Sequence, residues 1–373
     1  MTKRILVLLA ALALVAAACG GDGGDDTTTT EAAGDTTTTE AMDTTTTEAM
    51  DTTTTEAMAS DVGTADNPIR VLFVPSVSAD EIIAGGEILD QTLEEATGLV
   101  FEVDVPASYA ATIEEICAAP ETTMGFIPAQ AYVLASDLCD VSIELKAERF
   151  GYTEYWTQYI VPRDSDITSL EQLAGLTWAY PDPGSTSGFL VPSGELGNLG
   201  IEPGEGVEAG GHTGVGRAVA NGEAEFGTQF FSPLTNSADE VVWDGTDETA
   251  DVPADLIDSC GPNADGDLTC GDLFVNDARA GLAEEVPDVI QKVRILAISD
   301  PIPNDGVVFG PDFPEDLKTM VVDAIVAFAT DDPDGFEAAF DAYSWDNVAT
   351  TNDAEFDSIR AIVQQLGITL DDL

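Results

Sequence analysis

Apolar runs of strand length alternate with amphipathic stretches of helix length through most of the chain. The first run, IRVLFVPS at 69–76, is rich in branched side chains and predicts a buried strand. A helix is predicted from Ser78 to Gly98, because Ser78 can cap it, Glu81 follows three residues later and a glycine ends it. The same pattern then predicts a strand at 99–108, a helix at 109–119, and a strand followed by a helix within 124–139. This alternation indicates a largely parallel sheet covered by helices on both faces.

A second α/β unit follows the strand predicted at 156–164, in which apolar and polar side chains alternate. Its further predicted elements are a helix at 169–175, a strand at 176–182, helices at 185–196 and 214–224, and a strand at 225–232. After an Asp-, Gly- and Pro-rich excursion at 244–272, a strand predicted at 293–305 leads out of the unit. Three helices are predicted to end the chain, at 314–329, 334–343 and 355–367.

Two of the predicted strands, near residues 158 and 297, connect the two units, so the chain is expected to have two lobes. We assign 67–160 together with 298–373 to lobe 1, and 161–297 to lobe 2. Ligands of open α/β sheets bind at the carboxyl ends of the strands, which for two lobes is the cleft between them.

The first 19 residues have the pattern of a secretory signal. A positively charged start, MTKR, precedes an apolar run that ends at Cys19 and is followed by two glycines. The run is too short to span a membrane, and no other stretch of the sequence is long enough. The cysteine indicates a lipoprotein signal with the lipid on Cys19, although Ala16 stands where leucine is usual. The alternative is an ordinary signal peptide in which Cys19 has no role.

Residues 20–66 have the composition of a tether. The octapeptide DTTTTEAM occurs three times in tandem, at 35–42, 43–50 and 51–58. A degenerate copy precedes them at 26–33. Threonine-rich, acidic sequence of this kind cannot bury an apolar core, and it predicts disorder. The tether would hold the folded part of the chain away from the membrane surface.

The charge of the chain narrows the choice of partners. The 373 residues include 70 acidic and 12 basic ones, a formal net charge of −58, and 44% are hydrophobic, enough for a sizeable core. Such a charge disfavours nucleic acid and anionic membrane surfaces as partners, so membrane contact is expected through the lipid alone. It also repels anionic ligands, so an anion site would need a local positive potential. No cofactor is predicted, and the chain is expected to be a monomer.

Cysteine usage fits an extracytoplasmic protein with disulfides. Of the five cysteines, four remain when Cys19 is set aside, and four allow three pairings. The pairing that closes the shortest loops joins Cys117 to Cys139 and Cys260 to Cys270. Metal binding is the alternative, but the chain has one histidine and no C-x-x-C motif, so no metal site is predicted.

The stretch YPDPGSTSGFLVPSG at 180–194 places three small hydroxyl groups together. Ser185, Thr186 and Ser187 fall at the cap and first turn of a predicted helix, where backbone N–H groups lack partners and the helix dipole is positive. With Gly188 allowing close approach, these groups predict an oxyanion site that needs no arginine or lysine. The alternative is that Ser185 only caps the helix and that the other hydroxyls face solvent.

His212, the one histidine, follows the predicted strand in GVEAGG and precedes the helix predicted at 214–224. Cleft residues gather at such strand-to-helix junctions in open sheets. The imidazole ring could donate a hydrogen bond to an oxyanion, and more strongly if it were protonated. The alternative is a purely structural histidine.

Three segments, DPGSTSGFLVP, GGHTGVGRAVANGEAEFG and DPIPNDGVVFGPDFP, in this order and spacing, resemble the phosphate/phosphite/phosphonate-binding proteins of ABC importers. The resemblance covers about residues 69–330. It implies a type 2 periplasmic-binding-protein fold, an α/β fold of two lobes that are joined by two crossover strands and close on the ligand. It also implies that Ser185, Thr186 and Ser187 hold the phosphoryl oxygens and that His212 helps.

The resemblance places two further residues in the cleft, Tyr109 on lobe 1 and Asp305 in the segment PIPND. The sequence departs from the family at Ile127, where some members have an aromatic residue, at Glu225 in GEAE, and in TQFFSPL, which lacks a family carboxylate.

A carboxylate repels a dianion, so Asp305 favours binding only if the ligand carries a proton or an amine. Asp305 would then reject sulfate, which is fully ionised at neutral pH. The alternative is that Asp305 is a turn residue.

The predicted function is that of an extracytoplasmic solute-binding lipoprotein that delivers phosphonate, phosphite or phosphate to an ABC permease by hinge closure, without covalent chemistry. One alternative is a phosphoester hydrolase on the same fold, with Ser185 or Ser187 as nucleophile and His212 as base, although no G-x-S-x-G motif is present. Another is a surface adhesion protein, which the threonine-rich stalk alone supports and which would have no small-molecule affinity.

Overall fold

The computed structural model describes residues 61–238 and 240–373, which lie within one compact unit. The predicted signal peptide, Cys19 and nearly all of the predicted tether lie outside the described residues. The fold begins a few residues before the predicted start at Asn67, because Val62 is buried and the N–H of Val100 donates to the carbonyl of Gly63 at 2.9 Å. None of the described helices has the length and apolar character needed to cross a membrane.

The first sheet has six strands in the order β16-β4-β15-β3-β1-β2. Their bounds are β1 Ile69–Phe73, β2 Phe101–Asp104, β3 Thr123–Ile127, β4 Ser142–Glu148, β15 Gly306–Phe309 and β16 Asn347–Thr350. Strand β1 pairs in parallel with β2 and β3, whereas β15 pairs antiparallel with β3 and β4. The prediction of a largely parallel sheet is therefore wrong for half of this sheet, because β15 returns from the second sheet in the opposite direction.

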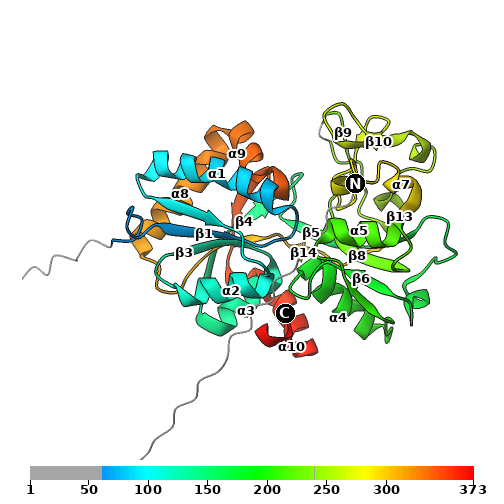
Figure 1. The fold of residues 1–373 in the computed structure, drawn as a ribbon, viewed down its shortest axis with the longest axis horizontal. Helices are drawn as coiled ribbons and strands as arrows, with labels where there is room; N and C mark the ends of the chain where they lie inside the picture. The colour runs from blue at the N-terminus through cyan, green and yellow to red at the C-terminus, as the bar shows by residue number, and fades with distance from the viewer. Residues whose placement is uncertain (1–60, 239) are drawn as a thin grey trace, which may run out of the picture. The chain divides into compact units, whose positions relative to one another are not determined.

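Helices cover both faces of the first sheet (Figure 1). Those packed in its two hydrophobic clusters are α1 Ala79–Thr97, α8 Glu315–Asp331 and α9 Pro333–Phe340 on one face, and α2 Tyr109–Ala118 and α3 Ala129–Cys139 on the other. Alternate residues of β1 point to opposite faces, so Val71 packs with the first group and Leu72 with the second. The strands and helices predicted between residues 69 and 139 are confirmed in their order and type.

The second sheet also has six strands, in the order β13-β5-β8-β6-β7, with β14 paired to β5. Their bounds are β5 Glu154–Pro162, β6 Trp178–Tyr180, β7 Gly206–Glu208, β8 Phe226–Phe231, β13 Val293–Ile298 and β14 Ile302–Pro303. Its helices are α4 Val191–Asn198, α5 His212–Ala220 and α7 Val289–Lys292. Because β5 pairs with β8 through Ile160 and with β13 through Pro162, the predicted lobe boundary at residue 160 falls inside a strand of this sheet.

Two predicted elements of the second unit differ in the structure. The helix predicted at 169–175 is a short 3-10 turn at Leu170–Leu173. The strand predicted at 293–305 is interrupted at residues 299–301, between β13 and β14. Pro301 contributes to the interruption, since proline cannot donate to a strand ladder.

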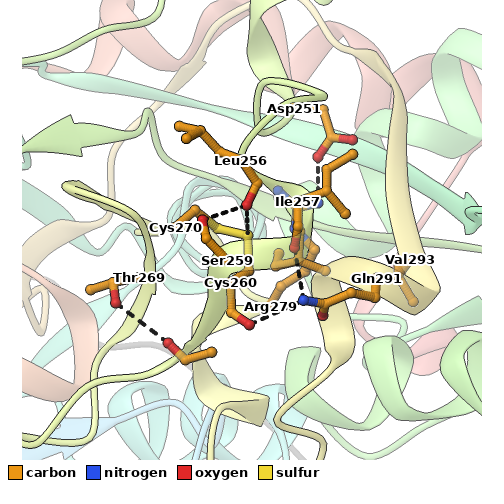
Figure 2. The surroundings of a disulfide bond; sticks show 12 residues. Asp251, Leu256, Ile257, Ser259, Cys260, Thr269, Cys270, Arg279, Gln291 and Val293 are labelled. Atoms are coloured by element: carbon orange, nitrogen blue, oxygen red, sulfur yellow. Dashed lines mark hydrogen bonds and ion pairs between the residues drawn. A yellow bond between two sulfur atoms is a disulfide. The ribbon is translucent and has the colours of Figure 1, made fainter.

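The Asp-, Gly- and Pro-rich excursion forms a small antiparallel sheet in the order β10-β11-β12-β9. Its strands are β9 Thr235–Asn236, which precedes the excursion, β10 Cys260–Pro262, β11 Leu268–Cys270 and β12 Leu273–Phe274, which directly follows it. The excursion also contains the helix α6 Asp247–Ala250. Cys260 and Cys270 lie opposite each other across β10 and β11 and form a disulfide (Figure 2). Gln291 of α7 donates to the carbonyl of Cys260 at 3.0 Å, which fixes this hairpin against the second sheet. Cys117 and Cys139 form the other disulfide, so the short-loop pairing is confirmed.

The last helix, α10 Asp357–Leu366, contacts both α3 and α4 (Figure 1). Ile362 lies so close to Gly194 that a Cβ added there would be 2.8 Å from the isoleucine Cγ2. Gln365 donates to Oδ1 of Asn198 at 2.8 Å. The C-terminal helix therefore contacts elements of both sheets, although the sequence assigned it to lobe 1.

Candidate ligand-binding site

The stretch after Ser185 does not form the single regular helix that the sequence predicts. Thr186–Leu190 form one turn of π-helix that leads directly into α4. The N–H of Leu190 donates to the carbonyl of Ser185 at 3.1 Å, and the N–H of Val191 donates to that of Thr186. Turns with this five-residue spacing are rare in proteins, and many of those that occur lie at functional sites.

Pro192 contributes to the widening of this turn. Because proline has no N–H, it leaves a carbonyl of the preceding turn without a helical donor. Thr157 of β5 donates instead to the carbonyl of Ser187 at 2.7 Å, and Thr228 of β8 donates to that of Gly188 at 2.5 Å. Both threonines are fully buried, so they fix the π turn firmly against the second sheet.

Gly188 is required by packing within the protein. A Cβ at this position would lie 2.3 Å from Cδ of Pro181 and 2.8 Å from Oγ of Ser185. The sequence analysis assigned Gly188 to close approach of a ligand, and the structure corrects this assignment because the close neighbours are protein atoms. Ser185 caps the turn by accepting from the N–H of Gly188 at 3.1 Å.

A cavity of about 60 Å³ lies beside this turn, between loops of the two sheets. All six residues that the sequence nominated for ligand binding line it: Tyr109, Ser185, Thr186, Ser187, His212 and Asp305. Polar residues that the sequence analysis missed also line it: Ser76, Arg149, Tyr155, Ser232, Tyr343 and Ser344. Since one water needs roughly 10–15 Å³ of such volume, the cavity has room for about five water-sized groups, the size of a tetrahedral oxyanion.

The π turn presents hydrogen-bond donors to the cavity. Ser185, Thr186 and Ser187 are at most 2% exposed. The backbone N–H groups of Thr186 and Ser187 have no acceptor among the described residues, as expected at the start of a helix. Oγ1 of Thr186 accepts from the backbone N–H of Gln130 at 2.8 Å, so its own hydrogen remains to be donated, and the Tyr155 phenol lies within hydrogen-bond reach of this hydroxyl.

His212 is the first residue of α5, and its ring is fixed from behind. Nδ1 accepts from the backbone N–H of Phe230 at 3.2 Å, which assigns the ring proton to Nε2, 3.3 Å from Oγ of Ser185. Burial lowers the pKa of His212 to about 3. The ring is therefore a neutral Nε2–H donor, and the protonated form considered from the sequence is not populated at neutral pH.

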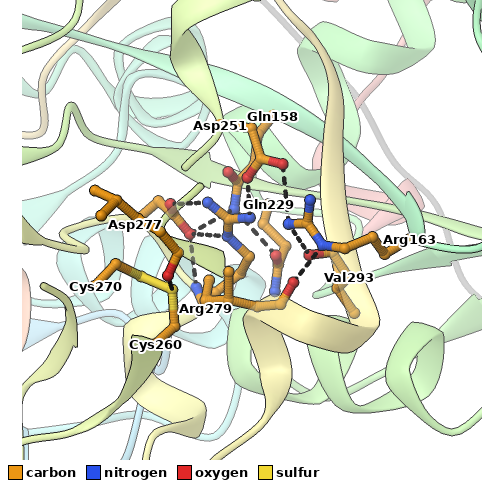
Figure 3. A network of polar contacts seen from close by, with 11 residues as sticks. Gln158, Arg163, Gln229, Asp251, Cys260, Cys270, Asp277, Arg279 and Val293 are labelled. Atoms are coloured by element: carbon orange, nitrogen blue, oxygen red, sulfur yellow. Dashed lines mark hydrogen bonds and ion pairs between the residues drawn. A yellow bond between two sulfur atoms is a disulfide. The ribbon is translucent and has the colours of Figure 1, made fainter. Parts of the chain in front are cut away.

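The N-terminus of α5 rests on a buried polar network. Figure 3 shows the part of the network that includes Gln158, Gln229, Asp277 and Arg279. Gln229 donates to the carbonyl of His212 at 2.5 Å and accepts from Gln158 at 3.2 Å. Gln158 also donates to Asp277 at 3.1 Å, and Asp277 forms a fully buried ion pair with Arg279 at 2.8 Å. The position of His212 thus depends on groups in β5, β8 and the segment after β12.

Three tyrosines line the cavity, Tyr109 and Tyr343 from elements beside the first sheet and Tyr155 from β5 of the second. Tyr109 is the first residue of α2 and is 2% exposed. Burial, with the nearby carboxylate of Asp182, raises the pKa of Tyr109 well above its ordinary value. Burial also raises the pKa of Tyr155 and of Tyr343, so all three phenols keep their protons, and that of Tyr343 is donated to the carbonyl of Val74 at 2.7 Å.

Asp305 lies in the cavity wall, and its partner is a residue that the sequence analysis missed. Nη2 of Arg149 is 2.6 Å from Oδ2 of Asp305, and the two side chains are 10% and 14% exposed. The sequence predicts an oxyanion site that needs no arginine or lysine, and in the structure an arginine lines the cavity with its guanidinium paired to Asp305. Arg149 directly follows β4, a strand that the sequence analysis did not identify.

The positions at which the sequence departs from the family lie mostly outside the cavity wall. Ile127 is buried in β3, where it pairs with Gly306, and Glu225 accepts a hydrogen bond from the N–H of Thr177. The segment TQFFSPL supplies an aromatic ring and a hydroxyl to the wall, from Phe230 and Ser232.

Two α/β sheets whose loops meet around a small cavity rich in donors define a solute-binding protein of the periplasmic type. Residues 71–356 match the family model described as "ABC transporter, phosphonate, periplasmic substrate-binding protein", and the chain belongs to this family. The phosphate-import protein PhnD of Mycolicibacterium smegmatis is 26% identical over 248 residues, which are 62% of this chain and 71% of that protein.

Solved structures show the same fold. PhnD1 of Prochlorococcus marinus in complex with methylphosphonate superposes with a TM-score of 0.59 and 14% identity, covering 80% of this chain and 98% of that one. A binding-protein component of an ABC phosphonate transporter from Pseudomonas aeruginosa gives a TM-score of 0.57 at 17% identity, covering 79% and 84%. The type 2 periplasmic-binding-protein fold implied by the sequence is confirmed.

Proposed function

We propose that this protein is an extracytoplasmic lipoprotein that binds phosphate, phosphite or a small phosphonate and delivers it to an ABC permease. The observation that carries the proposal is the small cavity, whose wall combines backbone N–H groups, hydroxyls and a neutral imidazole donor. These short-range donors offset the repulsion that a chain of net charge −58 exerts on an anion. The import function of the mycobacterial relative and the methylphosphonate bound to the Prochlorococcus protein support the ligand class.

The proposed mechanism is closure of two lobes around the ligand. The lobes are those assigned from the sequence, with two changes. Lobe 1 starts at Val62 instead of residue 67, and the chain first crosses to lobe 2 just before β5 instead of at residue 160. Lobe 2 still ends at residue 297, and 298–373 belong to lobe 1. Lobe 2 contributes the π turn and His212, and lobe 1 contributes Tyr109 and Asp305. Closure buries the ligand, which strengthens every hydrogen bond that it accepts.

The site geometry does not support hydrolysis, although Ser185 and His212 are in contact. A catalytic base must offer an unprotonated nitrogen to the serine. Here the N–H of Phe230 occupies Nδ1, so the nitrogen that faces Ser185 carries the proton. The lowered pKa of His212, caused by burial, also makes the ring a poor proton acceptor.

Isothermal titration calorimetry of the chain without residues 1–19 tests the proposal. The ligand panel is phosphate, phosphite, methylphosphonate and sulfate, and a chromogenic phosphate ester serves to detect turnover. One-to-one binding of at least one phosphorus oxyanion without turnover is expected. If none of them binds, the proposal fails, and turnover of the ester would favour the hydrolase.

Lipid attachment is tested separately. Metabolic labelling with a fatty acid is expected to mark the full chain and to leave a Cys19→Ser variant unlabelled. Equal labelling of both chains, or labelling of neither, would contradict a lipid on Cys19.

A further inference from the structure

Arg149 is held rigidly at the point where the chain passes from the first sheet to the second. It directly follows β4 and forms a two-way backbone bridge with Tyr152, at 2.9 Å in each direction. The two residues between them, Phe150 and Gly151, have φ angles of 52° and 76°, which makes this a tight turn. The position of the Arg149 backbone is therefore set by the turn.

Three hydrogen bonds fix the Arg149 guanidinium. Nε donates to the carbonyl of Tyr343 at 2.7 Å, Nη1 to Oδ1 of Asn304 at 2.9 Å, and Nη2 to Oδ2 of Asp305 at 2.6 Å. Asn304 is fully buried, and its amide donates to the carbonyls of Ala147 and Tyr152, so it cannot turn away. The guanidinium therefore stays beside one oxygen of Asp305.

The other carboxylate oxygen, Oδ1 of Asp305, has no hydrogen-bond partner in the described part of the chain. Among the described residues that line the cavity, Arg149 carries the single full positive charge and Asp305 the single carboxylate. An isolated carboxylate in such a buried place takes up a proton when a second anion binds beside it, because like charges raise its proton affinity. A neighbouring cation opposes that uptake.

We propose that Arg149 keeps Asp305 ionised while an anion is bound, so that Oδ1 is an obligatory hydrogen-bond acceptor and Arg149 is a specificity-determining positioning residue. The site then selects an oxyanion that carries a proton on oxygen, as protonated phosphate, phosphite and methylphosphonate do, and it rejects sulfate. This inference rests on the proposed oxyanion-binding function and adds the residue that enforces selection.

Two roles for Arg149 make different predictions. If the guanidinium only attracted anions, its removal would weaken phosphate and sulfate alike. If it acts through Asp305, its removal lets Asp305 accept a proton and become a donor, and sulfate then gains relative to phosphate. Sulfate does not exchange protons itself near neutral pH, so any proton taken up from the buffer when sulfate binds is accepted by a group of the protein.

The test compares Arg149→Met with the unaltered chain by calorimetry, in buffers of different ionisation enthalpy. Arg149→Met is expected to bind sulfate with uptake of about one proton, and the ratio of sulfate Kd to phosphate Kd should fall roughly ten- to a hundredfold. Arg70→Met is the matched control, since Arg70 pairs with Asp104 and Glu115 and does not line the cavity. It should leave both the ratio and the proton count unchanged.

A second variant, Asp305→Asn, tests the same inference if Arg149→Met does not fold. An asparagine can donate to sulfate, so the Kd ratio should fall without proton uptake. In the Asp305→Asn background, Arg149→Met should change the ratio little further, because the two substitutions affect one interaction.

The inference is overturned if Asp305→Asn keeps full discrimination, or if a folded Arg149→Met keeps the original ratio and proton count. It is also overturned if the unaltered chain binds sulfate as tightly as phosphate. Those results would leave oxyanion binding intact, whereas failure of the unaltered chain to bind any oxyanion would remove the proposed function itself.

Discussion

The backbone N–H of Gln130 donates to Oγ1 of Thr186 at 2.8 Å. Gln130 is the second residue of α3, on the first sheet, whereas Thr186 begins the π turn on the second. The Gln130 side chain adds a hydrogen bond to the carbonyl of Pro183 at 3.1 Å. One threonine hydroxyl therefore joins a helix of the first sheet to the π turn of the second, and it still has a hydrogen that it can donate.

Thr186→Val should keep the fold and weaken oxyanion binding. Valine has nearly the same shape but cannot donate to an anionic oxygen, a loss of about 1.5–3 kcal/mol of binding free energy. It also leaves the buried N–H of Gln130 without an acceptor, which should lower the unfolding free energy by roughly 1–3 kcal/mol. Calorimetry and urea unfolding measure the two effects.

Two controls accompany Thr186→Val. Thr186→Ser retains the hydroxyl and should retain most of the affinity. Thr330→Val removes a hydroxyl that bonds to the carbonyl of Val326 within α8, and it should not change affinity. Unchanged affinity in Thr186→Val would remove Thr186 from the site.

Two glycines of one segment should respond to alanine in opposite directions. Gly188→Ala places a Cβ 2.3 Å from Pro181, so the π turn must shift, and both stability and oxyanion affinity should fall. Gly197→Ala in α4 meets no atom within 4 Å and should raise the unfolding free energy by up to about 1 kcal/mol, since alanine favours helix. Thermal unfolding and calorimetry compare the two variants. Equal effects would show that the turn tolerates displacement.

Local sequence pattern was sufficient for the first half of the first sheet. From β1 to α3, each element buries its own apolar face against its chain neighbours. The order of strands and helices could therefore be predicted from the spacing of apolar residues. The direction of the other strands could not be predicted in this way, because it depends on pairing between segments far apart in sequence. Val308 of β15, for example, pairs with Ile143 of β4. Nothing in either segment alone specifies that partner, and β4 itself was missed.

The same limit applies to the site. Ser185, Thr186 and Ser187 could be found because their chemistry is contiguous in sequence and resembles a known family. Arg149 could not, because what gives it a role is Asp305, which is 156 residues away. The π turn was also missed, since it depends on carbonyls that are satisfied by threonines of two other strands.

The two disulfides should contribute similarly to stability and differently to binding. In the chain-entropy account, replacing either pair by serines lowers the unfolding free energy by about 3 kcal/mol. The Cys260–Cys270 hairpin does not line the cavity, so its loss should leave affinity unchanged. Cys117–Cys139 joins α2 to α3, whose first turns carry Tyr109 and Gln130, so its loss should also weaken binding. Calorimetry on both serine variants would contradict this if the affinities changed equally.

His212 should make stability depend on pH, with a definite sign. Burial lowers the pKa of His212 to about 3 in the folded chain, against an ordinary value of 6.5, so below pH 6.5 the unfolded chain binds a proton that the folded chain does not. The unfolding free energy should therefore decrease as the pH is lowered, by about 2 kcal/mol from pH 7.5 to pH 5. Buried carboxylates such as Asp182 and Glu195, whose pKa values are raised by burial, act in the opposite sense. The measurement is thus the difference in urea unfolding between the unaltered chain and His212→Gln across this range, and a difference independent of pH would show that His212 is not buried as a neutral ring.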